Sequence, residues 1–247
     1  MFDKFLGMLD SNRSYFLASD IRSFEPLRFK LDDALKGSDL KPAFYIFNRY
    51  QRRLLERLDY SLSILGQGVD QFDFSIAESL QIDREDAEWP ADRQAQNNLW
   101  RQRLKAQILS LRLNEKEDAE ISEILTKRLR NRIRMAKRNK SEDAFQLYMN
   151  AFASTFDPHT QYFSPRTSEN FNINMSLSLE GIGAVLKSED DATSIVRLVP
   201  AGPAAKSKAI KPTDKITAVG QGKDGPMIDI VGWRLDDVVE LIRGPRG

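Results

Sequence analysis

The chain has 247 residues, of which 41% are apolar and 30% are charged. This length suits one large domain or two ordinary domains with a substantial buried core, and the pattern along the chain favours two. The formal net charge is only +1, which excludes a global attraction to nucleic acid or to acidic membranes. The sequence contains no cysteine, which excludes disulfides, thiolate nucleophiles and Cys-ligated zinc.

The first residues and the apolar runs bear on membrane targeting. Residues 1–6 lack the basic-then-apolar pattern of a secretory signal, and no apolar run approaches the roughly 20 residues that span a bilayer. We therefore expect a soluble chain, with any signal sequence removed upstream.

The first half of the sequence has a helical period. Between Asp39 and Leu65 the apolar residues recur at three- and four-residue intervals, which predicts an amphipathic helix. Asp39 is the expected cap and Pro42 is tolerated in the first turn. Gly66 and Gly68 are expected to end this helix.

Three further helices are predicted after an irregular acidic stretch at residues 66–90. Their apolar stripes are Leu99, Trp100, Leu104, Ile108 and Leu111; then Ile121, Leu125, Leu129 and Ile133; then Phe145, Tyr148, Met149 and Phe152. Ser141 is the expected cap of the last of these helices. Residues 1–155 are accordingly predicted to form an all-helical domain.

The pattern changes after Thr155. Residues 156–176 are predicted to be a connecting segment with two Pro turns, and residues 177–247 a small module of mixed structure. Strands are expected near 175–187, 193–199, 214–219 and 227–230, with helices at Pro203–Ser207 and Trp233–Ile242. Because the closing Gly244-Pro245-Arg246-Gly247 is a turn that normally leads into another strand, we expect the chain to be part of a longer protein.

The single histidine is the first candidate for chemistry. His159 lies in Asp157-Pro158-His159-Thr160, where the Asp before Pro favours a turn in which the carboxylate accepts backbone N–H bonds. We expect His159 to be a structural residue packed against this turn rather than a catalytic one. No second His or any Cys completes a zinc site, and no Gly-Xaa-Ser-Xaa-Gly elbow is present. The sequence predicts no catalytic residue, no metal and no cofactor in this chain.

A basic segment is the second candidate. Residues Lys127 to Lys140 include eight Lys or Arg and no acidic residue, a composition found in nucleic-acid or lipid-headgroup patches. Leu129 and Ile133 continue the buried stripe, however, so the cations occupy the solvated faces of a helix and its C-terminal end. No aromatic residue lies between them to stack on bases. We therefore expect no nucleic-acid binding and leave a protein or membrane-surface contact open.

The third candidate is a glycine loop. Gly181, Ile182, Gly183 and Ala184 lie where one strand is expected to give way to the next, and such a loop can direct backbone N–H groups into a nest that binds an anion. Val185 to Lys187 would then offer a strand edge to an extended ligand, and the apolar face of the 233–242 helix would form a side-chain pocket. The alternative is a glycine turn that serves only a tight bend.

Many of these residues together carry a resemblance to a known family. They are Tyr15-Phe16-Leu17, Ser19-Asp20-Ile21, Phe44 to Tyr50, Asp157-Pro158-His159-Thr160, Tyr162, Ser164-Pro165, Phe171, Met175 to Leu186, Gly202-Pro203-Ala204-Ala205, Trp233 to Val239 and Gly244-Pro245. On these residues the chain resembles the bacterial tail-specific, or carboxy-terminal processing, serine proteases of the large periplasmic type. The resemblance extends over essentially the whole chain.

The resemblance implies an α+β chain in which an N-terminal all-helical domain is followed by a PDZ-like domain that lacks its last strand. In this family the PDZ domain recognises the nonpolar C-terminal tail of a substrate and regulates the protease core. By position, Gly181, Ile182, Gly183 and Ala184 would bind the carboxylate and Val185 would lie on the pairing strand. The groove would be lined by Leu235, Val238, Val239 and Ile242. Thr213-Asp214 departs from the family pattern, in which a Gly-Asp turn is usual.

The resemblance also implies activity, location and partners. The family hydrolyses peptide bonds with a Ser nucleophile and a Lys base, which would follow Gly247, so this chain alone is predicted to be inactive. The whole protein would process or degrade envelope proteins in the periplasm, and a lipoprotein adaptor would contact the helical domain. The missing strand would expose a sheet edge that invites a dimer or a swapped assembly. The alternative is a PDZ interaction scaffold without enzymatic activity.

Overall fold

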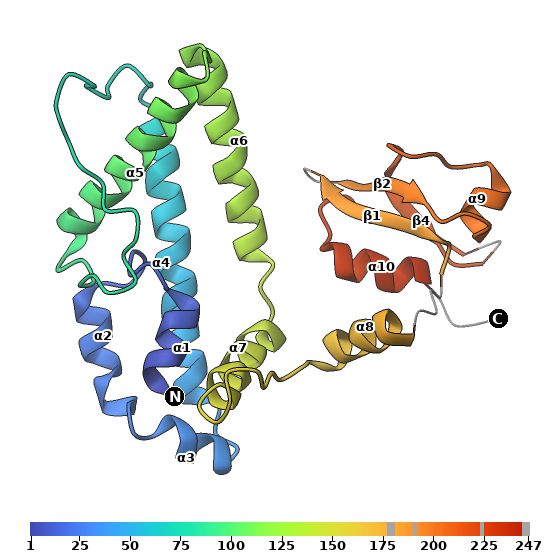
Figure 1. The fold of residues 1–247 in the computed structure, drawn as a ribbon, viewed down its shortest axis with the longest axis horizontal. Helices are drawn as coiled ribbons and strands as arrows, with labels where there is room; N and C mark the ends of the chain where they lie inside the picture. Colours follow the sequence, from blue (N-terminus) through green and yellow to red (C-terminus); the bar gives the residue numbers. More distant parts are fainter. Residues whose placement is uncertain (177–180, 190–191, 223–224, 244–247) are drawn as a thin grey trace. The chain divides into compact units, whose positions relative to one another are not determined.

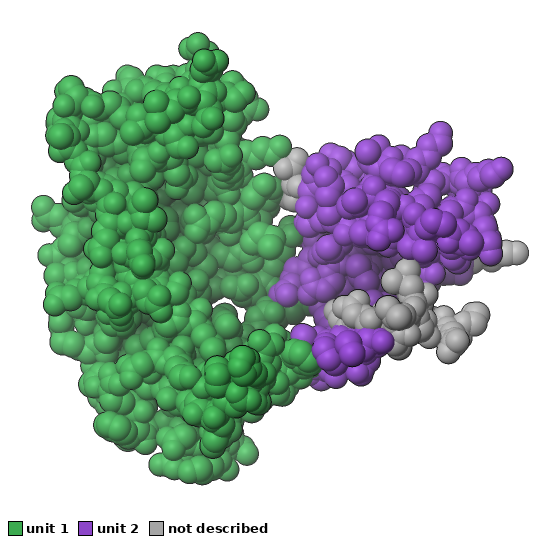
Figure 2. Space-filling view, in the orientation of Figure 1, with its two compact units in different colours: residues 1–164 green, residues 165–247 purple. Residues whose placement is uncertain are grey.

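The computed structural model describes residues 1–176, 181–189, 192–222 and 225–243. Contacts divide the chain into two compact units, Met1–Ser164 and Pro165–Gly247, which are coloured separately in Figure 2. The first unit is helical and the second combines helices with small antiparallel sheets (Figure 1). The predicted α+β class is therefore confirmed.

The first unit contains seven described α-helices and one short 3₁₀ turn. They are α1 (Phe2–Leu9), α2 (Ala18–Phe24), the turn Glu25–Leu27, α3 (Leu31–Lys36), α4 (Lys41–Leu65), α5 (Arg93–Leu113), α6 (Asp118–Lys137) and α7 (Ser141–Ala153). The prediction that Asp39 caps α4 was wrong, because Leu40 is the N-cap residue; the carboxylate of Asp39, one residue earlier, accepts the backbone N–H of Lys41 at 3.1 Å. Pro42 lies in the first turn of α4, where a missing N–H is tolerated.

Two apolar clusters form the core of this unit, and α4 contributes to both. The first cluster joins α1, the early part of α4 and α7; its members include Phe5, Ile46 and Tyr148. The second joins the end of α4 to α5 and α6; its members include Leu58 and Ile108. Complete burial of one such side chain stabilises the folded unit by about 1.5–3 kcal/mol. Because α4 contributes side chains to both clusters, it connects the two ends of the unit.

The buried face of α7 differs from the prediction. Ala144, Tyr148 and Ala151 are buried, whereas the predicted Phe145 and Phe152 are only partly buried. The two alanines are small and allow α7 to approach α1, where the rings of Phe5 and Tyr148 meet edge to face at 5.5 Å. The ring of Phe145 instead packs against Tyr162, in the segment after the helix.

A buried ionic cluster joins α2 to α4. Asp20 is 1% exposed and accepts hydrogen bonds from Arg49 and Arg53, each with a closest distance of 2.7 Å, and from the N–H of Leu17. Burial alone would raise the pKa of Asp20, but the bonds from Arg53, Leu17 and Arg49 outweigh it and lower the pKa. Asp20 is therefore held ionised inside the helical unit.

Residues 66–92 connect α4 to α5 without helix or strand, in agreement with the predicted irregular stretch. Glu78 secures this loop to α5 through ion pairs with Arg101 and Lys105. Hydrogen bonds from these two cations lower the pKa of Glu78 to about 2. These ion pairs hold the 66–92 loop against α5.

The second unit begins with a helix and continues into two small sheets. Its elements are α8 (Pro165–Ser176), β1 (Ala184–Glu189), β2 (Ala192–Leu198), α9 (Pro203–Ser207), β3 (Lys215–Ile216), β4 (Ala218–Gly220), β5 (Met227–Asp229) and α10 (Leu235–Arg243). One sheet has the order β1-β2-β3 and the other pairs β4 with β5, all antiparallel. Ile195, Ala204, Ile230 and Val238 are buried in this unit.

Three predictions about this unit were wrong in detail. Pro165 does not form a second turn but opens α8, a position where proline costs little. The strand predicted at 175–187 begins only at Ala184, because Met175 belongs to α8; residues 177–180 lie outside the described residues. The single strand predicted at 214–219 is two strands in different sheets. The predicted closing turn at 244–247 also lies outside the described residues.

Candidate functional site

The glycine loop has a backbone that requires glycine. Gly181 has φ +124° and Gly183 has φ +74°, both in the region that side-chain-bearing residues rarely adopt. A methyl group on Gly183 would lie 3.1 Å from the Cα of Gly202 and 3.5 Å from the Cδ of Pro203. The loop therefore passes so close to the start of α9 that a side chain at Gly183 would force its neighbours to shift.

The carbonyl groups of this loop are fixed by the neighbouring segment. The Ile182 carbonyl accepts the N–H of Ala204 at 2.8 Å, and the Gly183 carbonyl accepts the N–H of Val199 at 2.7 Å. The C=O and N–H of one trans peptide unit point in opposite directions. The N–H groups of Gly183 and Ala184 consequently point away from residues 199–204.

The N–H groups of residues 182–184 are the part of the loop that could meet an anion. Within the part of the chain that the structure describes, the N–H groups of Ile182 and Gly183 donate no hydrogen bond. An unpaired backbone N–H carries a fixed partial positive charge, and successive groups of this kind form anion-binding nests. The geometry is compatible with the predicted carboxylate loop, although the same glycines also serve the tight approach to α9.

Strand β1 continues from this loop along an open sheet edge. In the described sheet, β1 pairs with β2 on one side only. Helix α10 contacts β1 (Figure 1). Val185 lies on this strand, opposite Arg197 of β2, and a register shift separates it from Leu186. An edge of this kind offers alternate N–H and C=O groups to an added strand.

Helix α10 supplies an apolar face to the same place. Leu235, Val239 and Ile242 are partly exposed, whereas Val238 is fully buried at 0% exposure. Val238 therefore packs into the core of the unit, and the other three keep surface that a ligand side chain could cover. The glycine loop lies at the far end of this helix, because a methyl group on Gly181 would be 3.7 Å from the Cα of Arg243.

The structure thus brings the predicted residues into one region. Loop 181–183 leads directly into β1, and it also touches the end of α10. The loop, the strand edge and the helix face are the three parts that capture of a C-terminal peptide requires.

A set of ion pairs behind this region was missed by sequence reasoning. Arg166 of α8 binds three carboxylates of α10, namely Asp236 at 3.1 Å, Asp237 at 2.9 Å and Glu240 at 3.0 Å. Arg243 of α10 pairs with Glu169 of α8 at 3.2 Å. The signal that could have found them is the three-residue spacing of Arg166 and Glu169 directly after Pro165, which places both on one helix face.

The turn that contains the histidine has the predicted backbone but not the predicted packing. The carboxylate of Asp157 accepts the backbone N–H of His159 at 3.0 Å and the hydroxyl of Thr160 at 3.1 Å, as expected. The side chain of His159, however, is exposed, so the expectation that it packs against the turn was wrong. The carboxylate of Asp157 closes the turn without help from the imidazole, which lies in solvent.

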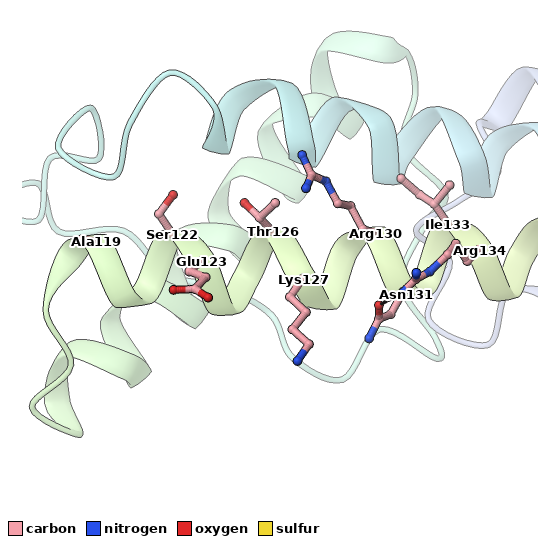
Figure 3. Close-up of a pocket in the computed structure, with 9 residues that line it drawn as sticks. All are labelled: Ala119, Ser122, Glu123, Thr126, Lys127, Arg130, Asn131, Ile133 and Arg134. Atoms are coloured by element: carbon pink, nitrogen blue, oxygen red, sulfur yellow. Dashed lines mark hydrogen bonds between the residues drawn. The ribbon is translucent and has the colours of Figure 1, made fainter. Parts of the chain in front are cut away.

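The basic helix α6 borders a surface hollow of about 710 Å³. Its lining residues are Ala119, Ser122, Glu123, Thr126, Lys127, Arg130, Asn131, Ile133 and Arg134 (Figure 3). The side chains of Lys127 and Arg130 point to different sides of the helix in Figure 3, so they do not converge on one point. Leu129 is buried as predicted. This arrangement suits a solvated helix face better than a phosphate site.

Metal sites and membrane-spanning helices are the remaining features to consider in the described residues. No group of three or more His, Asp or Glu side chains is arranged there to hold a metal ion. None of the helices in those residues is both long enough and apolar enough to cross a bilayer.

Comparison with known families identifies both units. Residues 1–166 match the model described as the tail specific protease N-terminal domain, and residues 170–247 match the PDZ domain. The mixed unit is accordingly a PDZ domain, as the resemblance implied.

Known proteins with similar sequences extend this result. A tail-specific protease of Haemophilus influenzae is 44% identical over the whole chain, which spans 35% of that protein. A carboxy-terminal processing protease, CtpA, of Bacillus subtilis is 35% identical over 91 residues, which are 37% of this chain and 18% of that protein. The chain therefore spans about a third or less of the length of these relatives.

One solved structure is also similar in sequence. It is a crystal structure of the PDZ domain of a carboxy-terminal protease from Vibrio cholerae in complex with peptide. It is 58% identical, covers 28% of this chain and 69% of the solved chain, and superposes with a TM-score of 0.27.

Proposed function

Because the chain belongs to the tail-specific protease family, we propose that its PDZ unit recognises the nonpolar C-terminal tails of protein substrates. The observation that carries this proposal is the direction of the loop peptides. The carbonyls of Ile182 and Gly183 are bound to Ala204 and Val199, which turns the N–H groups of Gly183 and Ala184 toward the side where a ligand can approach.

The mode of binding follows from the parts of the site. An extended tail adds to the open edge of β1, and its main chain exchanges hydrogen bonds with that strand. Its terminal carboxylate accepts bonds from the loop N–H groups, as anions do at backbone nests. Its last side chain covers the exposed parts of Leu235, Val239 and Ile242. An apolar side chain is favoured because burial stabilises apolar surface by about 25 cal/mol per Å².

The whole protein would then be a serine protease that processes or degrades envelope proteins in the periplasm. The relatives are proteases by name, which supports a protease rather than a non-enzymatic scaffold. The Ser nucleophile and Lys base of such an enzyme would lie outside these 247 residues, so this chain alone would not cleave protein. The helical unit would be the surface for a lipoprotein adaptor. The adaptor contact and the dimer or swapped assembly of this chain both rest on the family resemblance.

The proposal is tested with a pair of fluorescent peptides of one sequence that ends in apolar residues. One carries a free C-terminal carboxylate and the other a C-terminal amide. Fluorescence anisotropy with the full 247-residue chain should show that amidation weakens binding about tenfold or more, the loss expected for a charge-assisted interaction. Equal binding of the two peptides would overturn the carboxylate-loop assignment.

A second measurement tests the lack of activity. An unfolded protein substrate incubated with the chain should remain intact. Specific cleavage, retained after further purification, would mean that a nucleophile lies within these residues.

A further inference from the structure

We propose that Arg243 is the cation that pairs with the terminal carboxylate of the bound tail, and that Glu169 of α8 competes for it when the site is empty. This inference rests on the proposed function, since it concerns the same loop. It adds a charged side chain to a site that was otherwise built from backbone N–H groups and apolar side chains.

The position of Arg243 is the first argument. Arg243 is the last described residue of α10, and its backbone and side chain lie against the glycine loop. A methyl group on Gly181 would be 3.7 Å from the Cα of Arg243 and 3.8 Å from its Cγ. The aliphatic part of the arginine side chain therefore starts beside the loop, within reach of a group held by the N–H groups of Gly183 and Ala184.

The electrostatics of α10 provide the second argument. The C-terminal end of a helix carries about half a negative charge, because its last carbonyl groups have no partners within the helix. The glycine loop lies beside that end of α10, which disfavours a carboxylate there. A cation at the last helical position offsets this field, and Arg243 is in that position. Arginine also presents a planar fork that matches both carboxylate oxygens.

The ion pair with Glu169 provides the third argument. The guanidinium of Arg243 meets the carboxylate of Glu169 at 3.2 Å, and the two side chains are 22% and 64% exposed. Arg243 is therefore already arranged to bind a carboxylate group. Because Glu169 is mostly in solvent, this contact is weak enough to exchange for a ligand.

Helix α8 keeps the competitor in place. Arg166, one turn before Glu169, is fastened to Asp237 and Glu240 on α10 at 2.9 and 3.0 Å. These contacts hold α8 on α10 independently of Arg243. Glu169 is consequently presented to Arg243 whether or not a ligand is bound, and it competes at a fixed local concentration.

The test uses three variants and both peptides of the acid and amide pair. Arg243→Gln removes the charge beside the loop. Lys215→Gln is the matched control, because Lys215 is an exposed cation of the same unit on β3, which β2 separates from the open edge of β1. Glu169→Gln removes the competitor and leaves Arg243 intact. Hydrogen exchange of the β1–β2 amides confirms that each variant keeps its fold.

The expected results differ between the peptides. Arg243→Gln should weaken binding of the acid peptide about tenfold and leave the amide peptide unchanged, so that the preference for the acid collapses. Lys215→Gln should leave this preference as it is in the natural chain. Glu169→Gln should strengthen acid binding about two- to fivefold, the range expected for an exposed ion pair, and should not affect the amide.

The outcomes separate this inference from the proposed function. If the natural chain binds acid and amide equally, the proposed function fails. If it prefers the acid and Arg243→Gln keeps that preference, only the role of Arg243 is refuted. Equal weakening of both peptides by Arg243→Gln would show a structural role and would also refute the inference. If Arg243→Gln fails to fold, the Glu169→Gln variant tests the inference instead. An unchanged affinity of that variant for the acid peptide would contradict the proposed competition between Glu169 and the peptide carboxylate.

Discussion

Replacement of Gly183 by alanine tests the glycine loop most sharply. At φ +74° an alanine costs about 1–2 kcal/mol because its Cβ approaches the following carbonyl. The new methyl would also lie 3.1 Å from the Cα of Gly202 and 3.5 Å from the Cδ of Pro203. These are backbone and ring atoms that cannot rotate away, and overpacking of this kind costs about 1–3 kcal/mol. Gly183→Ala should therefore destabilise the PDZ unit by about 2–5 kcal/mol, the sum of the two terms.

The matched control is Gly222→Ala. Gly222 has a similar φ of +66°, but a methyl there would meet no described atom within 4 Å. It should lose only the conformational term of about 1–2 kcal/mol. Hydrogen exchange measured by mass spectrometry on the full chain reports the opening free energy of the β1–β2 amides. An equal loss in the two variants would refute the close approach of the loop to α9.

Three other perturbations test the rest of the account. Asp20→Ala should destabilise the helical unit by about 3–5 kcal/mol in urea unfolding, because it removes the buried carboxylate that binds both Arg49 and Arg53 and leaves Arg53 only its pair with Glu56; a loss under 1 kcal/mol would contradict the cluster. Thr213→Gly should stabilise the PDZ unit by about 0.5–1 kcal/mol, because Thr213 has φ +77°, and an unchanged opening free energy would contradict this. Arg101 and Lys105 lower the pKa of Glu78 from its ordinary value of 4.5 to about 2. Its ion pairs therefore contribute their full stability above pH 4.5, and this stability is lost as the pH falls toward 2. Exchange of the 66–92 loop, corrected for intrinsic rates, should rise over that interval in the natural chain but not in Glu78→Gln, and identical profiles would oppose this role.

The long helices could be predicted because their signals are local. The stripe from Ile121 to Leu129 repeats every four residues and is buried in α6 as expected. The glycine loop could be predicted for a similar reason, since Gly181 and Gly183 both have the positive φ that favours glycine. In each case, the signal lies in residues that are close together in the sequence.

The parts that sequence reasoning missed depend on tertiary contacts. Helix α8 has only a weak apolar pattern, and its ion pairs with α10 involve residues about 70 positions away, such as Arg166 and Asp236. The face of α7 was mispredicted because large side chains were expected inside, whereas Ala144 and Ala151 are buried instead. The role of Arg243 follows from its contact with Gly181, which no spacing along the chain indicates. The departure at Thr213, by contrast, was visible in the sequence, and its positive φ explains why glycine is usual there.

The central claim is that backbone N–H groups of the glycine loop bind a terminal carboxylate. Nuclear magnetic resonance of the ¹⁵N-labelled full chain measures this directly through the amide signals of Ile182, Gly183 and Ala184. Titration with the free-acid peptide should shift the Gly183 and Ala184 amides downfield as they donate hydrogen bonds. The amidated peptide at equal occupancy should leave them nearly in place and shift only the β1 amides. Equal shifts with both peptides, or none in the loop with the acid, would contradict the account.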